Sequence, residues 1–134
     1  MRTFKHEKID LGYLDRDVVA ESTKMGRLYS TPDGSFPSVT TVLSILTEDA
    51  IAAWRARVGE EEANKISHKA SSRGTKVHSI IEDYLNGKDT KDYLPHIKQS
   101  LENVRTIIDR KIGSIYGIEV PLYSKHLGVA GLRS

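Results

Sequence analysis

The sequence predicts an α/β (α+β) fold with an N-terminal hairpin, several helices and a C-terminal β-hairpin. The clearest signal is an apolar stripe at helical spacing between residues 77 and 85. The turn Thr31-Pro-Asp-Gly34 separates two short extended segments. Residues 115–132 contain two apolar segments around a Ser-Lys-His turn, which is typical of a hairpin. The helices therefore precede most of the sheet that they need to pack against.

Composition favours one domain without disulfides or membrane spans. The chain has 134 residues, 38% of them hydrophobic, which suits a single modest core. It has no cysteine, which excludes thiolate metal sites and suits a reducing cytoplasm. No apolar segment approaches the roughly 18 residues of a membrane span, so we expect a cytoplasmic protein with no membrane partner. The formal charge of +2 permits contact with nucleic acid without predicting it.

The first half of the chain predicts an arm, a hairpin and two helices. Residues 1–26 lack a sustained apolar period and are expected to form an irregular arm with at most a short strand. Residues 27–37 predict the first hairpin. Ser38 precedes apolar residues at helical spacing and is a candidate N-cap. A second helix is expected from Thr47, with acidic residues in its first turn, to Gly59.

The second half predicts three more helices and the last hairpin. Three glutamates beginning at Glu60 place negative charge at a helix N-terminus, and Asn86-Gly87 is a typical C-terminal signal. The expected elements are a helix over 60–74, a helix over 77–85, a helix over 92–111, and strands over 115–123 and 127–132.

His78 and Glu82 are candidate site residues because they are four positions apart. On a helix this spacing puts both side chains on one face, where they can share a cation or form a hydrogen bond. The plainer interpretation is a polar pair at the boundary of the apolar stripe. The sequence between them differs from the zinc-protease pattern, because no second histidine follows at the required position.

Glu119 lies in the otherwise apolar stretch that follows Ile115. A carboxylate in such a strand must face solvent, be paired, or bind a metal. A solvent-facing residue is the simple interpretation. With His78 and Glu82, Glu119 would complete a set of donors suited to Mg²⁺ or Mn²⁺.

A basic cluster precedes His78. Its members are Lys65, His68, Lys69, Arg73 and Lys76. The segment 71–75 offers hydroxyls, a guanidinium and free backbone N–H groups at a helix start, so it predicts a phosphate-binding segment. The alternative is a solvated charged face.

Five segments in order carry a family resemblance: Phe36-Pro-Ser-Val-Thr-Thr-Val-Leu43; Trp54-Arg with Val58-Gly-Glu-Glu-Glu-Ala63; Arg73-Gly-Thr-Lys-Val-His78 with Ile81-Glu82; Gly117-Ile-Glu119; and Gly128-Val-Ala-Gly131. Together they resemble the phage-type exonucleases of the PD-(D/E)xK superfamily, close to RecB-like nucleases and the mitochondrial genome maintenance exonuclease. The resemblance implies that residues 27–134 form the N-terminal portion of such a domain, an incomplete restriction-endonuclease-like core.

The resemblance also implies site roles. His78 matches a histidine that helps to hold a divalent metal, Mg²⁺ or Mn²⁺. Glu82 and Glu119 match acids of the same catalytic site. Lys65, Lys69, Arg73 and Lys76 would then contact DNA. A phage-encoded protein in a host cytoplasm, or a bacterial one, is expected.

The end of the sequence departs from the family pattern. Family members continue Gly-Val-Ala-Gly-x-x-Asp and then add a Glu-x-Lys pair, whereas Ser134 stands at the aspartate position. Metal-assisted phosphodiester cleavage needs carboxylates to fix the cations. We therefore expect a DNA exonuclease-like protein that cleaves little or nothing as this chain alone.

Two other functions stay open. The first is a non-catalytic DNA-binding or protein-interaction module that forms a homodimer through an open edge of its C-terminal strands. The second is a regulator that occupies DNA ends without cutting them.

Overall fold

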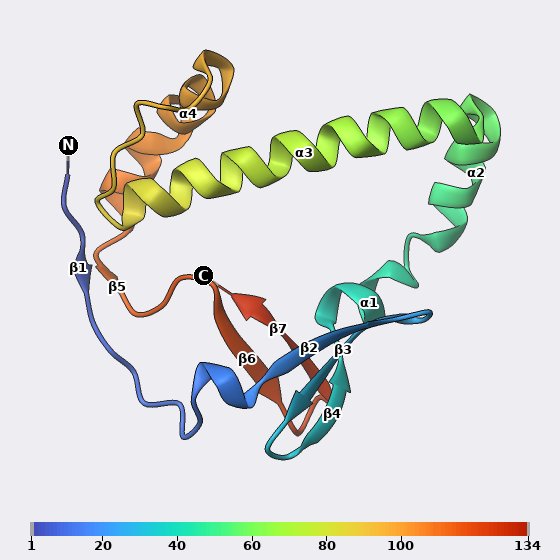
Figure 1. Cartoon of the computed structure of the whole chain (residues 1–134), viewed down its shortest axis with the longest axis horizontal. Helices are drawn as coiled ribbons and strands as arrows, with labels where there is room; N and C mark the ends of the chain where they lie inside the picture. Colours follow the sequence, from blue (N-terminus) through green and yellow to red (C-terminus); the bar gives the residue numbers. More distant parts are fainter. Residues whose placement is uncertain (1, 134) are drawn as a thin grey trace. The chain divides into compact units, whose positions relative to one another are not determined.

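The computed structural model describes residues 2–133. As expected, the fold is mixed α+β, with N-terminal strands, helices and a C-terminal antiparallel hairpin (Figure 1). The chain divides into two compact units. The first unit comprises Met1–Glu7 and Arg55–Tyr116, and the second comprises Lys8–Trp54 and Gly117–Ser134. Each unit is thus assembled from two separate segments of chain.

The first unit is dominated by one long helix, α3 (Glu60–Leu85), of 26 residues. Gly59, with a φ of 89°, precedes it, and Asn86 follows as its C-cap. The expectation of two helices separated near Gly74 is wrong. Gly74 does not have a positive φ, and a glycine inside a helix costs only about 1 kcal/mol relative to alanine. The good helix formers on both sides therefore carry α3 through it (Figure 1).

Helix α4 (Pro95–Lys111) packs against α3. It begins at Pro95 rather than at residue 92, because proline is suited to the first helical position, where its missing N–H is not needed. Two very short strands, β1 (Lys5–His6) and β5 (Ser114–Ile115), pair in parallel beside the helices. The buried apolar side chains of this unit are Phe4, Ala63, Ile80, Tyr84, Leu85, Ile97, Leu101 and Ile115.

Tyr84 is the centre of this core and is 1% exposed. The rings of Tyr84 and Phe4 form a T-shaped pair with 5.7 Å between centroids and an interplanar angle of 76°, a favourable aromatic geometry. The hydroxyl of Tyr84 donates a hydrogen bond to the carboxylate of Asp109 in α4. The ring of His6 forms a hydrogen bond of 3.0 Å with the carbonyl of Leu85. Buried polar atoms at the end of α3 are thus paired, as burial requires.

The second unit contains a three-stranded antiparallel sheet in the order β2 (Val19–Thr23), β3 (Gly26–Thr31) and β4 (Gly34–Pro37). The hairpin expected over residues 27–37 is confirmed as β3 and β4. Strand β2 extends it: the residues of β2 pair with those of β3 from Val19 opposite Ser30 to Thr23 opposite Gly26. A 3₁₀ turn, η1 (Asp15–Asp17), precedes β2.

The short helix α1 (Val39–Ser44) begins where the sequence indicated. Ser38 is its N-cap and accepts a hydrogen bond of 3.0 Å from the backbone N–H of Thr41. Helix α2 (Glu48–Val58) follows and leads from the second unit into the first. The described residues contain no helix with the length and hydropathy of a membrane span.

The last hairpin is formed by β6 (Val120–Ser124) and β7 (Val129–Arg133). The expected first strand, over 115–123, is too long, because Ile115 pairs with β1 and a bend intervenes before Val120. A parallel bridge joins Ser38 to Ala130, so β7 lies beside α1 and β4. The contact with Ser38 therefore covers part of the β7 edge of the last hairpin.

Candidate nucleic-acid interface

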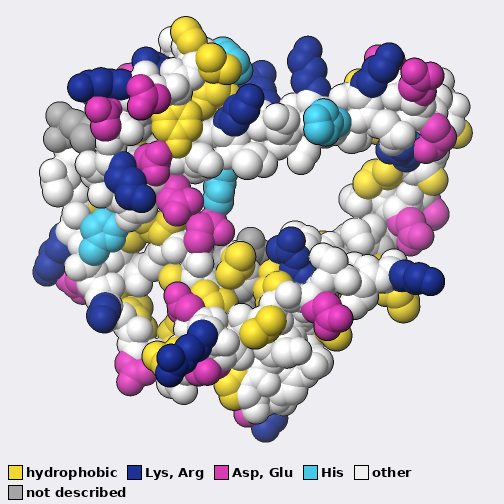
Figure 2. Space-filling view, viewed as in Figure 1, with side chains coloured by type: hydrophobic (Ala, Val, Ile, Leu, Met, Phe, Trp, Pro, Cys, Tyr) yellow, Lys and Arg dark blue, Asp and Glu magenta, His cyan; other side chains and the backbone are white. Residues whose placement is uncertain are grey.

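The middle of α3 is a helical segment exposed on every side. All thirteen residues from Asn64 to Lys76 are exposed, so tertiary packing does not hold this part of the helix. Lys65, Lys69 and Arg73 follow one another at intervals of four and share a face. Along the middle of α3, the coloured side chains in Figure 2 are mostly those of Lys, Arg and His. The segment therefore presents a basic surface to solvent.

Two acids at the start of α3 already have partners. The carboxylate of Glu60 accepts a bidentate hydrogen bond from Arg55, with a shortest N–O distance of 2.8 Å, and this bond lowers the pKa of Glu60. Glu61 lies 3.8 Å from the ammonium of Lys65. Both pairs are at the solvated surface, where such pairs contribute little stability.

Three cations further along α3 have no such partner. Within residues 2–133, no carboxylate oxygen lies within 4.0 Å of the charged groups of Lys69, Arg73 or Lys76. Lys69 and Arg73 are also four residues apart, and like charges at this spacing destabilise a helix slightly. Their positive charge is therefore available to an anionic ligand.

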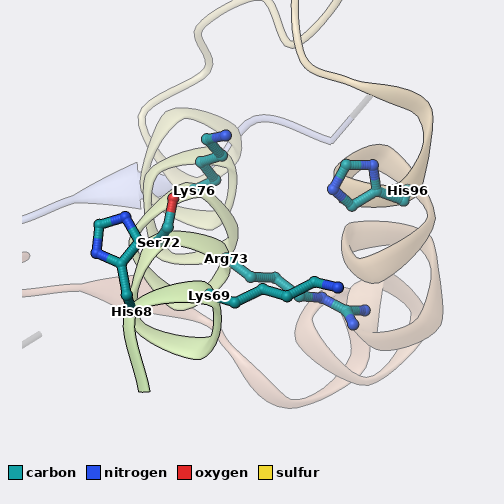
Figure 3. A pocket seen from close by; sticks show the side chains of 6 residues that line it. All are labelled: His68, Lys69, Ser72, Arg73, Lys76 and His96. Atoms are coloured by element: carbon teal, nitrogen blue, oxygen red, sulfur yellow. The ribbon is translucent and has the colours of Figure 1, made fainter. Parts of the chain in front are cut away.

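An open pocket of about 400 Å³ lies at these cations, between α3 and α4. In Figure 3, the side chains of Lys69 and Arg73 extend from α3 towards α4, and His96 approaches them from α4. Among the described residues, no acidic side chain lines the pocket. Its lining residues are His68, Lys69, Ser72, Arg73, Lys76 and His96.

The helix start expected at residues 71–75 does not exist. These residues lie inside α3, where each backbone N–H bonds to a carbonyl one turn earlier. The hydroxyl of Thr75 also donates to the carbonyl of Ser71 at 3.0 Å. The backbone therefore offers no free N–H groups here, and any phosphate must be bound by side chains.

His78 and Glu82 both lie on α3, one turn apart. His78 is exposed and Glu82 is half-buried. The neighbouring Asp83 accepts a hydrogen bond of 2.6 Å from the hydroxyl of Tyr93. This bond, with smaller effects of burial and of the charges of Asp83 and Glu82, raises the pKa of Tyr93 to about 12. The end of α3 thus carries adjacent carboxylates beside an exposed imidazole.

Glu119 is not a strand residue, contrary to expectation. It lies in the bend before β6 and has a φ of 55°. The bend is tight because Gly117 approaches Val120: a Cβ at Gly117 would lie 2.4 Å from a methyl carbon of Val120. Glu119 is half-buried. It belongs to the second unit, whereas His78 and Glu82 belong to the first.

The described part of the chain contains no group of three or more His, Cys, Asp or Glu side chains placed to hold a metal. Ser134, where the resemblance would lead one to expect an aspartate, lies outside the described residues. Comparisons with protein-family models, curated proteins and solved structures give no match.

Sequence reasoning did not include His96 among the site residues. One signal was present: His96 follows Pro95, in the first turn of a helix. A residue that can carry positive charge is unfavourable at the positive end of the helix dipole. A helix N-terminus of this kind favours a bound anion.

Proposed function

We propose that this chain binds DNA through the basic surface of α3, as part of a metal-dependent DNA exonuclease-like protein. The observation that carries the proposal is the set of Lys69, Arg73 and Lys76, three cations without carboxylate partners on an exposed helix. Lys69 and Arg73 are four residues apart, about 6 Å along the helix axis, and Lys76 follows three residues later. This spacing is close to that of alternate phosphates on one DNA strand, about 6.8 Å. Such a row suits a DNA strand, which carries a phosphate about every 3.4 Å along the duplex axis.

The nuclease part of the proposal is supported by the resemblance to PD-(D/E)xK exonucleases and by donor chemistry. His78 and Glu82 share one side of α3 at a spacing of one turn. Imidazole and carboxylate together suit Mn²⁺, and carboxylate oxygens suit Mg²⁺. When bound, such a cation activates water and stabilises negative charge during phosphodiester hydrolysis. Glu119 is the further acid that the resemblance assigns to the same site.

DNA binding is tested by fluorescence anisotropy with labelled single-stranded and duplex DNA over a range of salt concentrations. The logarithm of the affinity should fall linearly with the logarithm of the salt concentration. A triple variant, Lys69→Gln, Arg73→Gln and Lys76→Gln, should bind more weakly, with a salt slope smaller by about 1 for each lost phosphate contact.

The matched control removes the same charge from elsewhere. Lys24, Lys88 and Lys125 are exposed outside the proposed surface, and their triple Gln variant should retain most of the affinity. Equal loss in both triple variants would indicate that only net charge matters. Unchanged binding by the α3 variant would refute the proposed surface.

A further inference from the structure

We propose that the pocket between α3 and α4 is a binding site for a single phosphate group, held by Lys69 and Arg73 of α3 and by His96 of α4. The inference deepens the proposed function and rests on it to the extent that the phosphate belongs to DNA. It adds a defined subsite, with a residue from a second helix, to a surface that otherwise attracts a polyanion along its length.

The lining chemistry is selective for an oxyanion. The Arg73 guanidinium can donate two parallel hydrogen bonds to phosphate oxygens, and the Lys69 ammonium adds a point charge. Ser72 adds a hydroxyl that can donate, and His96 adds an imidazole N–H. The described residues of the lining include no acid, so none of them neutralises these cations.

The start of α4 is a second, independent observation. Leu94, the N-cap, makes no side-chain capping hydrogen bond, and Pro95 at the first position has no N–H. The positive end of the helix dipole therefore has no capping side chain, and His96 follows directly. Negative charge is favourable at a helix N-terminus and positive charge is not. An anion in the pocket would relieve the conflict between the dipole, His96 and the cations of α3.

The size of the pocket indicates how much of a ligand it accepts. A volume of about 400 Å³ falls in the range of small-molecule sites, roughly 300–1,000 Å³. This exceeds the needs of one phosphate group and leaves room for an attached sugar. The phosphate can therefore come from the DNA backbone or from a small phosphate ester such as a nucleoside monophosphate.

The test follows the backbone and His ring NMR signals of the full chain during titration with inorganic phosphate and with a nucleoside monophosphate, using chloride at equal ionic strength as reference. We expect saturable shifts confined to residues around Arg73 and His96 at millimolar ligand. The variants Arg73→Gln and His96→Gln should each weaken phosphate binding about tenfold, the effect of losing one charge-assisted hydrogen bond. Lys24→Gln should leave phosphate binding unchanged, because Lys24 lies outside both the pocket and the basic surface of α3.

Competition identifies the source of the phosphate. If inorganic phosphate displaces an oligonucleotide that has no terminal phosphate, the pocket holds a backbone phosphate of DNA. If phosphate binds without displacing DNA, the pocket serves a small phosphate ester. Absence of saturable binding, or equal weakening by Lys24→Gln and His96→Gln, would overturn the inference. Its failure is distinct from that of the proposed function, because DNA binding along α3 would then persist in His96→Gln.

Discussion

The hydroxyl of Tyr123 donates a hydrogen bond of 2.8 Å to the carboxylate of Asp33, joining residues 90 positions apart in the sequence. Tyr123 lies on β6, and Asp33 lies in the turn between β3 and β4. The ring of Tyr123 also stacks on Phe36, at 6.0 Å between centroids, and lies 4.9 Å from the ring of Tyr13. This contact therefore connects the last hairpin to the first sheet within the second unit.

The Tyr123 contact predicts a stability loss at alkaline pH. The bond to Asp33, more than burial or nearby charge, raises the pKa of Tyr123 above its usual value near 10. A raised folded-state pKa gives a contribution that is complete below about pH 10 and disappears as pH rises through the folded-state pKa. The free energies of unfolding of wild type and Tyr123→Phe, measured in urea, should differ near neutral pH and become equal at high pH. A constant difference across that range would contradict this assignment.

The continuity of α3 predicts opposite effects of two glycine substitutions. Gly74 is inside the helix, and an added Cβ would meet no atom within 4 Å. Gly74→Ala should therefore stabilise the protein by about 0.5–1 kcal/mol. Gly59 has the same open space but a φ of 89°, so Gly59→Ala should destabilise it by at least about 1 kcal/mol. Circular dichroism and urea unfolding measure both effects.

If α3 were broken at Gly74, the substitution Gly74→Ala should destabilise the protein instead of stabilising it. A glycine that the chain needs for a turn cannot be replaced without strain. Destabilisation by Gly74→Ala, with loss of helical signal, would therefore favour two separate helices over a continuous α3.

The same glycine explains where sequence reasoning failed. Locally, Ser71-Ser-Arg-Gly74 has the composition of a turn. A break would create two more helix ends, each with four backbone groups that lack partners within the helix. Helix formation is cooperative, so the flanking residues favour continuity. The phosphate-binding segment expected at residues 71–75 required a helix start, and the continuous helix α3 does not provide one.

Signals within a few residues were predicted well. The Ser38 cap, the hairpin at residues 27–37 and the burial of Ile80 and Tyr84 all follow from local spacing. The bend at Glu119 depends on how closely Gly117 approaches Val120, and the pocket at His96 depends on how α4 packs on α3. Neither relationship is encoded in the period of one segment, so the sequence alone could not provide them.

Removing the side chain of the N-cap Ser38 should lower the stability of the protein. Its side chain is 4% exposed and accepts from the backbone of Thr41. Ser38→Ala should cost about 1 kcal/mol of the free energy of unfolding. Ser35→Ala, at an exposed position of β4, is the matched control and should change it by less than about 0.5 kcal/mol. Equal effects of the two substitutions would mean that the cap contributes no specific stability.

The metal proposal predicts selective broadening of one histidine by Mn²⁺. If His78 and Glu82 hold a divalent cation together, millimolar Mn²⁺ should broaden the His78 ring signals in NMR spectra before those of His126. His126 is exposed in the turn between β6 and β7 and serves as an internal control. Glu82→Gln should shift the broadening of His78 to higher Mn²⁺ concentration, because a neutral amide binds a hard cation less tightly than a carboxylate.

Glu119→Gln extends this experiment to the second unit. If Glu119 contributes to the same site, its substitution should weaken Mn²⁺ binding at His78 as Glu82→Gln does, and the double variant should cost less than the sum of the two single effects, since ligands of one ion are not independent. If Glu119→Gln has no effect while Glu82→Gln does, the cation is held by α3 alone. Equal broadening of the His78 and His126 signals in every variant would refute the metal site and the metal-dependent part of the proposed function.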